Sequence, residues 1–183
     1  LALVGISSGT GGAGQRFVHH RMTIKRQPEH FLVEERLGEA FSSALRPAPD
    51  DRATLATFEL KKSGVSTTAA VQSLARELGV RGSDIGYAGL KDRYARTVQH
   101  VTAPMAAGAA ARFAERGVSR ETEGGSWFAR LIDWSAVHIA AEHIDGNRFT
   151  IVVRDLARNT THEMDRRAHV LRDGDGLLVV NYF

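Results

Sequence analysis

The feature that most constrains the fold is one amphipathic helix that lies between strand-like segments. Its apolar residues recur at intervals of three and four, the helical spacing: Val71, Leu74, Ala75 and Leu78. Ser66 and Thr67 are residue types that cap a helix N-terminus, and Gly79 is a typical C-terminal stop. A single apolar stripe on a helix is stable only when another surface covers it, so we expect this helix to pack on a sheet.

Strand-like segments precede and follow this helix. Alternating or aromatic-rich patterns predict strands at 31–36, 54–60, 97–101, 126–134 and 148–153. An Ala-rich segment at 105–116 predicts a second helix, and a capping-box sequence at 160–163 opens a third that ends at Gly174 and Gly176. The elements mix without the regular alternation that parallel sheets produce. The sequence therefore predicts an α+β fold with a mixed, largely antiparallel sheet and helices packed on it.

Composition excludes several classes of protein. The chain has 183 residues, 43% of them apolar, which is enough to bury the core of one domain. The absence of Cys excludes a disulfide scaffold, an iron–sulfur cluster, a cysteine nucleophile and a Cys-ligated zinc site. The apolar run at residues 1–6 is too short for a membrane span and lacks the features of a signal peptide, so we expect a cytoplasmic protein.

The net charge is a weak pointer to a polyanionic partner. The chain carries 24 Lys and Arg against 21 Asp and Glu, a formal net charge of +3. Phosphate contacts supply most of the sequence-independent affinity of proteins for nucleic acid. Many proteins without such a partner carry a similar charge, so the arrangement of the charges matters more than their sum.

The two ends of the chain differ from the segments between them. Residues 1–21 are rich in Gly and lack any periodicity, so we expect a flexible lead-in rather than a phosphate loop, which would need Lys-Ser/Thr after the glycines. Met22 stands just before the first patterned segment, and we hypothesise that the natural start lies there. Residues 177–183 begin an apolar, strand-like run on which the chain stops, so we expect the folded unit to be incomplete.

One candidate for chemistry is the segment 86–96, GYAGLKDRYAR. Its glycines allow a tight turn beside a ligand, and it places Asp92 among three cations, Lys91, Arg93 and Arg96. Positive neighbours keep a carboxylate ionised, which is the state that a nucleophile or general base requires. The alternative is a solvated turn whose charges merely pair with one another, and spacing alone favours that alternative.

Other segments carry weaker candidates. Within DGNRF at 145–149, Asn147 could orient a carboxylate and Phe149 offers a flat face to a base, although a turn Asn and a core Phe at the start of a strand fit the pattern better. The spacing of the histidines does not favour a metal site, because His138 and His143 are five residues apart and no second His follows His162-Glu163 at the metalloprotease spacing. The sequence also lacks a nucleophile-elbow motif for serine chemistry.

Taken together, these segments resemble one family, the TruD-type pseudouridine synthases, which isomerise uridine in RNA. Residues 25–35, KRQPEHFLVEE, are similar to that family's K-x-x-P-E-x-F-x-V-x-E opening. KSGVSTT at 62–68 and its helix lead to residues 89–99, which are similar to the signature G-x-K-D-x-x-A-x-T-x-Q. Residues 146–154 resemble G-N-x-F-x-I-x-L-R. Several ordered motifs between residues 24 and 183 are far more specific than any one of them alone.

The resemblance implies a role for each segment. Asp92 would attack or deprotonate a flipped-out uridine, so that the glycosidic bond breaks and the base reattaches through carbon. Phe149 would stack on that base, and Asn147 would orient Asp92. The other implied substrate-binding residues are Phe31 and Glu35 in the pocket wall, Lys25 and Lys91 at RNA phosphate or the aspartate, and Gln99. The partner would be tRNA, at uridine 13 in bacterial members of the family, or another structured RNA, and no cofactor or metal is implied.

The sequence also departs from the family pattern. Residues 138–144, HIAAEHI, stand where the family usually has the basic pattern K-L-R-x-G-x-L. Residues 179–183, VVNYF, resemble the start of V-P-N-Y-F-G-x-Q-R-F-G, with Val180 in place of Pro. We therefore expect residues 22–183 to form the N-terminal part of the catalytic domain, without its remainder and without the inserted TRUD domain. The chain is then either a pseudouridine synthase or a catalytically silent fragment or RNA-binding remnant.

Overall fold

The computed structural model describes residues 26–105, 110–155 and 162, and every structural statement below concerns these residues. The chain divides into two compact units, Ile24–Val152 and a second one of Leu1–Thr23 with Val153–Phe183. All the helices and strands described here belong to the first unit. The expected lead-in at 1–21, the helix that opens at 160 and the strand-like run at 177–183 lie outside the described residues.

The described elements follow one another as strands with short helices between them. The strands are β1 (Phe31–Leu37), β2 (Leu55–Ser63), β3 (Gly86–Tyr87), β4 (Arg96–Pro104), β5 (Val118–Thr122), β6 (Gly125–Ser135) and β7 (Ile144–Ile151). The α-helices are α1 (Glu39–Ala44), α2 (Thr67–Leu78) and α3 (Ala110–Glu115), and single 3-10 turns occur at η1 (Pro28–His30), η2 (Gly82–Asp84) and η4 (Ala141–His143).

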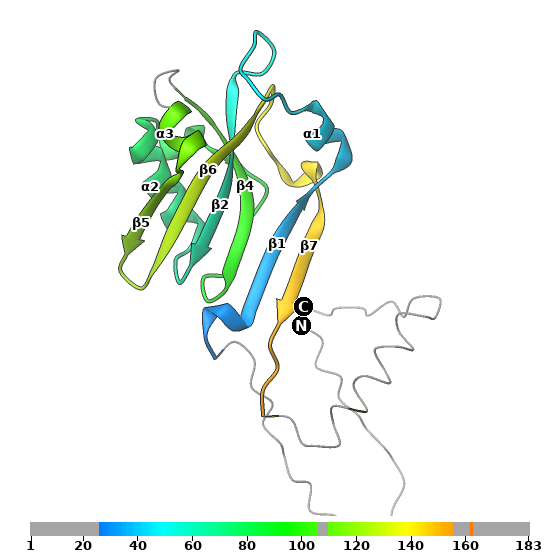
Figure 1. Cartoon of the computed structure of the whole chain (residues 1–183), viewed down its shortest axis with the longest axis vertical. Coiled ribbons are helices and arrows are strands. Elements are labelled where there is room, and N and C mark those ends of the chain that lie inside the picture. Colours follow the sequence, from blue (N-terminus) through cyan, green and yellow to red (C-terminus); the bar gives the residue numbers. More distant parts are fainter. Residues whose placement is uncertain (1–25, 106–109, 156–161, 163–183) are drawn as a thin grey trace, which may run out of the picture. The chain divides into compact units, whose positions relative to one another are not determined.

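The strands form one twisted sheet with the order β5-β6-β2-β4-β1-β7, and the short β3 pairs with β4 beside this path (Figure 1). The pairs are antiparallel except β1 with β4, which run parallel. The expectation of an α+β fold with a mixed, largely antiparallel sheet is therefore confirmed. The one parallel pair lies next to the edge strand β7, and the candidate site is built there.

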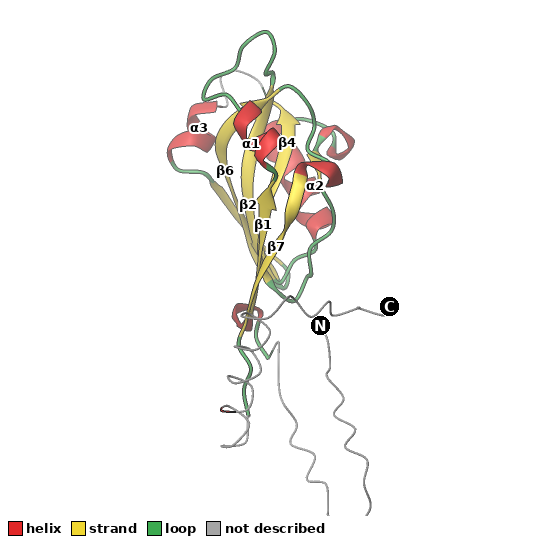
Figure 2. Ribbon diagram, turned by 90° about the vertical axis from the view of Figure 1, so that its right-hand side faces the viewer, coloured by secondary structure: helices red, strands yellow, loops and turns green. Residues whose placement is uncertain are grey.

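Helix α2 forms as its sequence predicts. The Ser66 side chain accepts a hydrogen bond from the Ala69 amide at 3.2 Å, and Gly79 ends the helix in the left-handed conformation at φ 71°. Helix α2 lies against one face of the sheet (Figure 2), and its apolar residues are buried in the core there. There Leu74 and Val71 join the buried core that Phe58 and Leu60 of β2 begin. None of the described helices is long and apolar enough to cross a membrane.

All the expected strands differ in their bounds from those in the structure, and α1, β3 and β5 were not expected. The strand expected at 148–153 begins earlier, at Ile144, so residues 145–149 lie within β7 rather than at its start. The helix expected at 105–116 is described only as Ala110–Glu115, and β4 runs on past the expected end at 101 to Pro104. Helix α1 is too short to show a helical period, and β5 exposes all of its residues except Val118, so neither gave a pattern.

We predict that Leu74→Ala lowers the free energy of unfolding by about 2–5 kcal/mol, because Leu74 is fully buried beneath the sheet and its truncation leaves a cavity. Arg76→Ala, on the exposed side of the same helix, should change it by less than about 0.5 kcal/mol. Urea unfolding of both variants measures the difference. Equal effects would contradict the packing of the helix on the sheet.

Candidate active site

Asp92 lies on the loop that joins β3 to β4, at one end of the sheet. Its side chain is exposed, and Oδ1 accepts a hydrogen bond from the Tyr94 amide at 2.9 Å. The next residue, Arg93, donates from Nε to the carbonyl of Gly64 at 3.2 Å and lies 5.6 Å from the centre of the Tyr94 ring. The loop therefore presents a carboxylate to solvent while its neighbours are tied to the protein.

The backbone of this loop is held from below by a lysine. Lys62 is only 2% exposed, and its Nζ donates to the carbonyls of Lys91 at 3.2 Å and of Asp92 at 2.8 Å. Burial lowers the pKa of Lys62 to about 8, with a smaller contribution from the charge of Lys91, while the charge of Asp92 acts to raise it. Burial of this ammonium group costs desolvation free energy, and its two hydrogen bonds to the segment that carries Asp92 offset part of that cost.

Two further buried side chains support the same loop. Thr67, at the first turn of α2, accepts a hydrogen bond from the Lys91 amide at 2.9 Å and donates to Oε1 of Gln99 at 3.1 Å. Gln99 in turn donates from Nε2 to the carbonyl of Gly89 at 3.4 Å. Gln99 is fully buried and lies under the loop. Its described bonds go to protein groups, so any influence on a substrate passes through the loop.

Glu35 of β1 lies at the point where the pairing partner of β4 changes from β1 to β3. The ladder of β1 with β4 ends at Val98, and that of β3 with β4 begins at Val101, so the amide of His100 has no strand partner in either ladder. Oε1 of Glu35 accepts that amide at 2.8 Å and lies 3.3 Å from Nδ1 of the same residue. The carboxylate thereby satisfies a backbone group that the sheet leaves unpaired.

The second oxygen of Glu35 pairs with Lys91, whose Nζ lies 2.7 Å from Oε2. The side chain of Glu35 is fully buried and that of Lys91 is 10% exposed. Burial alone would raise the pKa of Glu35, but the hydrogen bonds from His100 and Lys91 and the charge of Lys91 hold it below its usual value. Glu35 is therefore an ionised anchor for the residue that precedes Asp92.

The register of β1 with β7 brings the remaining site residues to this face. Glu35 stands opposite Asn147, and Val33 stands opposite Phe149. Residues directly opposite one another in an antiparallel pair point to the same face, so Asn147 and Phe149 lie beside the Glu35 anchor. The Phe149 ring is 56% exposed and tilts against the buried Phe31 ring with a centroid distance of 6.0 Å. Phe31 thus supports a flat apolar surface that faces solvent.

The structure places seven of the eight expected site residues, and Lys25 lies outside the described residues. It joins Glu35 to Lys91 and Phe31 to Phe149 directly, and it puts Gln99 beneath the loop. Sequence reasoning did not include Lys62, Thr67 or His100 among the site residues. A signal for Lys62 was present, because it follows Phe58 and Leu60 on the apolar face of an alternating strand, where a charged residue is unexpected.

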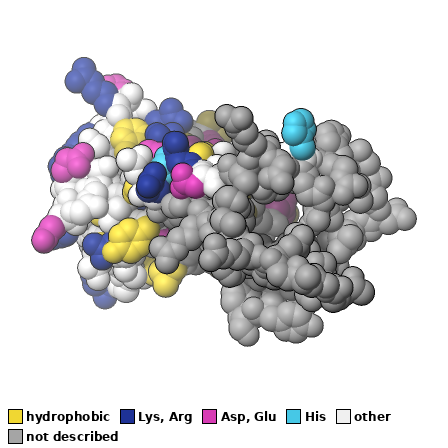
Figure 3. All heavy atoms as spheres, turned by 90° about the horizontal axis from the view of Figure 1, so that it is seen from below, with side chains coloured by type: hydrophobic (Ala, Val, Ile, Leu, Met, Phe, Trp, Pro, Cys, Tyr) yellow, Lys and Arg dark blue, Asp and Glu magenta, His cyan; other side chains and the backbone are white. Residues whose placement is uncertain are grey.

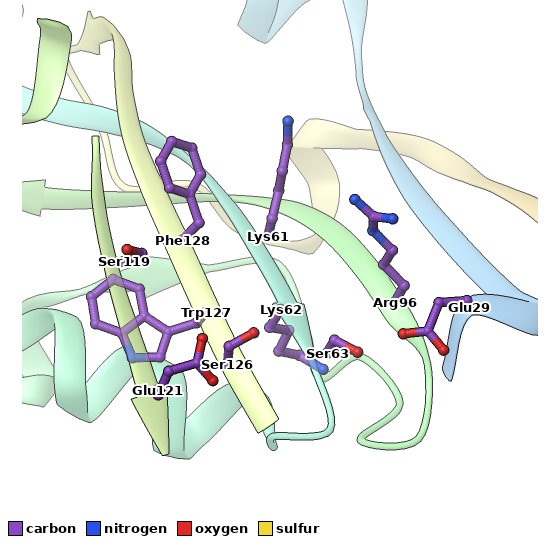
Figure 4. Close-up of a pocket in the computed structure, with 10 residues that line it drawn as sticks. All are labelled: Glu29, Lys61, Lys62, Ser63, Arg96, Ser119, Glu121, Ser126, Trp127 and Phe128. Atoms are coloured by element: carbon purple, nitrogen blue, oxygen red, sulfur yellow. The ribbon is translucent and has the colours of Figure 1, made fainter. Parts of the chain in front are cut away.

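A groove of about 470 Å³ opens over β2 and β6 at the same end of the sheet (Figure 4). Its lining residues are Glu29, Lys61, Lys62, Ser63, Arg96, Ser119, Glu121, Ser126, Trp127 and Phe128. Asp92 and Phe149 do not belong to this lining. The candidate site is therefore the exposed surface around the Asp92 loop and β7 rather than this groove.

Charged and apolar groups are mixed on this part of the surface. Figure 3 shows Lys and Arg side chains beside hydrophobic ones on the described surface seen from below. Tyr94 and Leu90, on either side of Asp92, are 65% and 71% exposed. Within the described ranges, no group of three or more His, Asp or Glu side chains could hold a metal ion. The surface beside Asp92 therefore combines a carboxylate with exposed apolar side chains.

The lowered pKa of Lys62 predicts a pH-dependent stability. Between pH 8 and 10.5 the folded state releases the Lys62 proton while the unfolded chain keeps it, so the unfolded state binds more protons and stability rises with pH. Relative to Lys62→Met, the wild-type chain should therefore gain up to about 3 kcal/mol over this range. Urea unfolding at several pH values measures the difference, in which the other titrating groups cancel. A constant difference would contradict a buried ammonium.

Comparison with known proteins places the chain in a family. The model of the tRNA pseudouridine synthase D (TruD) family matches residues 19–183. The chain is 34% identical over 161 residues to the probable tRNA pseudouridine synthase D of Thermococcus onnurineus (87% of this chain, 34% of that protein) and 31% identical over 163 residues to that of Geobacter sp. (89% and 34%).

A solved structure agrees with these matches at the level of the fold. The crystal structure of the protein given the same name in Methanosarcina mazei superposes with a TM-score of 0.62 at 20% identity, covering 82% of this chain and 32% of that one. The chain spans about a third of the length of these relatives. Because the family model covers nearly all of the sequence, the chain belongs to the tRNA pseudouridine synthase D family.

Proposed function

We propose that this chain carries the catalytic aspartate of a pseudouridine synthase that acts on tRNA, with Asp92 as the nucleophile or base. The observation that supports it best is the exposed Asp92 carboxylate on a loop whose backbone is bound by the buried Lys62, together with the exposed ring of Phe149 on β7. The curated relatives are named as tRNA pseudouridine synthases, which supports tRNA as the substrate, with uridine 13 as the proposed target.

The proposed reaction exchanges one bond of uridine for another. The glycosidic bond from nitrogen to the ribose breaks, the detached base turns, and a bond forms between its C5 atom and the same ribose carbon. The proton on C5 is then lost to solvent, and the ring nitrogen that left the ribose takes up a proton, so the atoms balance without an oxidant or reductant. An ionised Asp92 at the surface can attack or deprotonate the extruded nucleotide.

The neighbouring residues take supporting roles in this proposal. Phe149 stacks on the extruded base, because an exposed aromatic face held by Phe31 offsets part of the cost of extrusion. Asn147, exposed on β7 opposite Glu35, orients the reacting groups by hydrogen bonds. The Glu35–Lys91 pair forms the wall of the uridine pocket. Lys25, by the family resemblance alone, contributes to phosphate binding.

A tritium-release assay tests the role of Asp92. We expect the wild-type chain to release tritium from tRNA that contains 5-tritiated uridine, and Asp92→Asn to abolish this release because the amide is neither nucleophile nor base at neutral pH. Asp51→Asn, at an exposed aspartate of the loop before β2, is the matched control and should retain the activity. Release by Asp92→Asn at the wild-type rate would overturn the proposed role.

The same assay separates the second candidate function. A folded wild-type chain that binds tRNA but releases no tritium would contradict activity of this chain by itself and favour an RNA-binding remnant. A folded chain with neither property would favour a silent fragment.

We further predict that Phe149→Ala weakens binding of tRNA about 5- to 150-fold, since a stacked base contributes about 1–3 kcal/mol. Val137→Ala removes another exposed apolar side chain, 51% exposed in the segment between β6 and η4, and should leave binding unchanged. Titration of fluorescently labelled tRNA measures both dissociation constants. Equal affinities of Phe149→Ala and the wild type would argue against stacking.

A further inference from the structure

Lys62 is an unusual residue for the inner face of β2. Its neighbours across the sheet are Trp127 of β6 and Thr97 of β4, which are both buried. Its own strand places it on the same face as Phe58 and Leu60. An ammonium in such surroundings loses its hydration and destabilises the fold unless its donors are used. An apolar side chain could be buried here without the desolvation cost of an ammonium group. The amine is therefore expected to have another role.

The Lys62 amine donates two hydrogen bonds, one to each of the two peptide groups that flank Asp92. The carbonyl of Lys91 belongs to the peptide before the Asp92 Cα atom, and the carbonyl of Asp92 belongs to the peptide after it. Rotation about φ and ψ of Asp92 is what turns these two planar groups relative to each other. A single nitrogen that binds both carbonyls therefore fixes φ and ψ of Asp92 together.

The remaining freedom of Asp92 lies in its side chain, and the Tyr94 amide restrains it by binding Oδ1 at 2.9 Å. Thr67 adds a third restraint, because its hydroxyl oxygen accepts a hydrogen bond from the amide of Lys91, the residue before Asp92. With the backbone and one carboxylate oxygen fixed, the direction of the carboxylate is set before any substrate arrives. Such preorganisation is what a reacting group needs when small misplacements cost large factors in rate.

We propose that Lys62 is a positioning residue for Asp92, which acts by clamping the two peptide groups on either side of it. The proposal rests on the proposed function for its catalytic consequence, whereas the clamp itself is a property of the folded chain. Figure 4 shows Lys61 and Lys62 directed to opposite sides of β2, so their effects can be separated. Lys61 is half exposed and pairs with Glu59 at 3.0 Å.

The test compares Lys62→Met with the matched control Lys61→Met. Loss of two hydrogen bonds should raise amide hydrogen exchange in residues 89–95 about tenfold or more in Lys62→Met, while the amides of β2 and of α2 after its first turn keep their protection. In the tritium assay kcat should fall roughly 100-fold with KM little changed, because binding surfaces outside the loop are intact. Lys61→Met should resemble the wild type in both measurements.

A chemical rescue makes the test specific for the amine. Because the chain contains no Cys, Lys62→Cys introduces a single thiol. Alkylation of the unfolded variant with 2-bromoethylamine rebuilds an amine of lysine length, and 1-bromopropane builds the same length without one. After refolding, the aminoethyl product should regain loop protection and kcat, and the propyl product should behave as Lys62→Met does.

Each result decides the proposal. Unchanged exchange at residues 89–95 in Lys62→Met would overturn the clamp. Raised loop exchange with a wild-type kcat would overturn the positioning of Asp92. Global unfolding of both variants that lack the amine would assign Lys62 to stability and would also overturn it. An inactive wild type whose loop exchange still depends on the amine would instead count against the proposed function and leave the clamp established.

Discussion

The site depends on one defect in the sheet, the position where β4 stops pairing with β1 and has not yet begun to pair with β3. A strand that loses its neighbour exposes an amide that must find another acceptor. Glu35 supplies it by turning its carboxylate onto the His100 amide, and its other oxygen binds Lys91. The gap in the ladder thus becomes the attachment point of the loop that carries Asp92.

The protein interior contains two kinds of buried groups, apolar and polar, which affect the stability of the fold differently. Between α2 and the sheet, Leu74 and Phe58 are buried among apolar groups, and their burial stabilises the fold directly. Beneath residues 89–92 the buried groups are Lys62, Thr67 and Gln99, whose desolvation is offset only by the bonds that they make to one another and to the loop. These buried polar groups therefore fix the position of the loop more than they stabilise the fold, which is typical of a functional site.

The sequence predicts the apolar core well and the polar core poorly, for a physical reason. Helix α2 and strands β1 and β2 can be predicted from periodicity, because burial of one face of an element spaces its apolar residues regularly in the sequence. The contact of Glu35 with His100 spans 65 positions in the chain and depends on where a ladder ends, which periodicity does not encode. Family resemblance alone predicts Asp92, Asn147 and Phe149 as site residues, whereas the contacts of Glu35 required the register of the strands.

The placement of the lysines also changes how the net charge relates to RNA binding. The formal charge of +3 includes Lys62 and Lys91, yet the first is bound to loop carbonyls and the second to Glu35. Their ammonium groups are buried and serve the geometry of the protein, so they offer little to a phosphate backbone. In the proposed function, attraction of RNA by the described surface would fall to exposed cations such as Arg96 and Arg148. If the proposed function holds, the charge that positions Asp92 and the charge that attracts the substrate are carried by different residues, and the total charge cannot distinguish them.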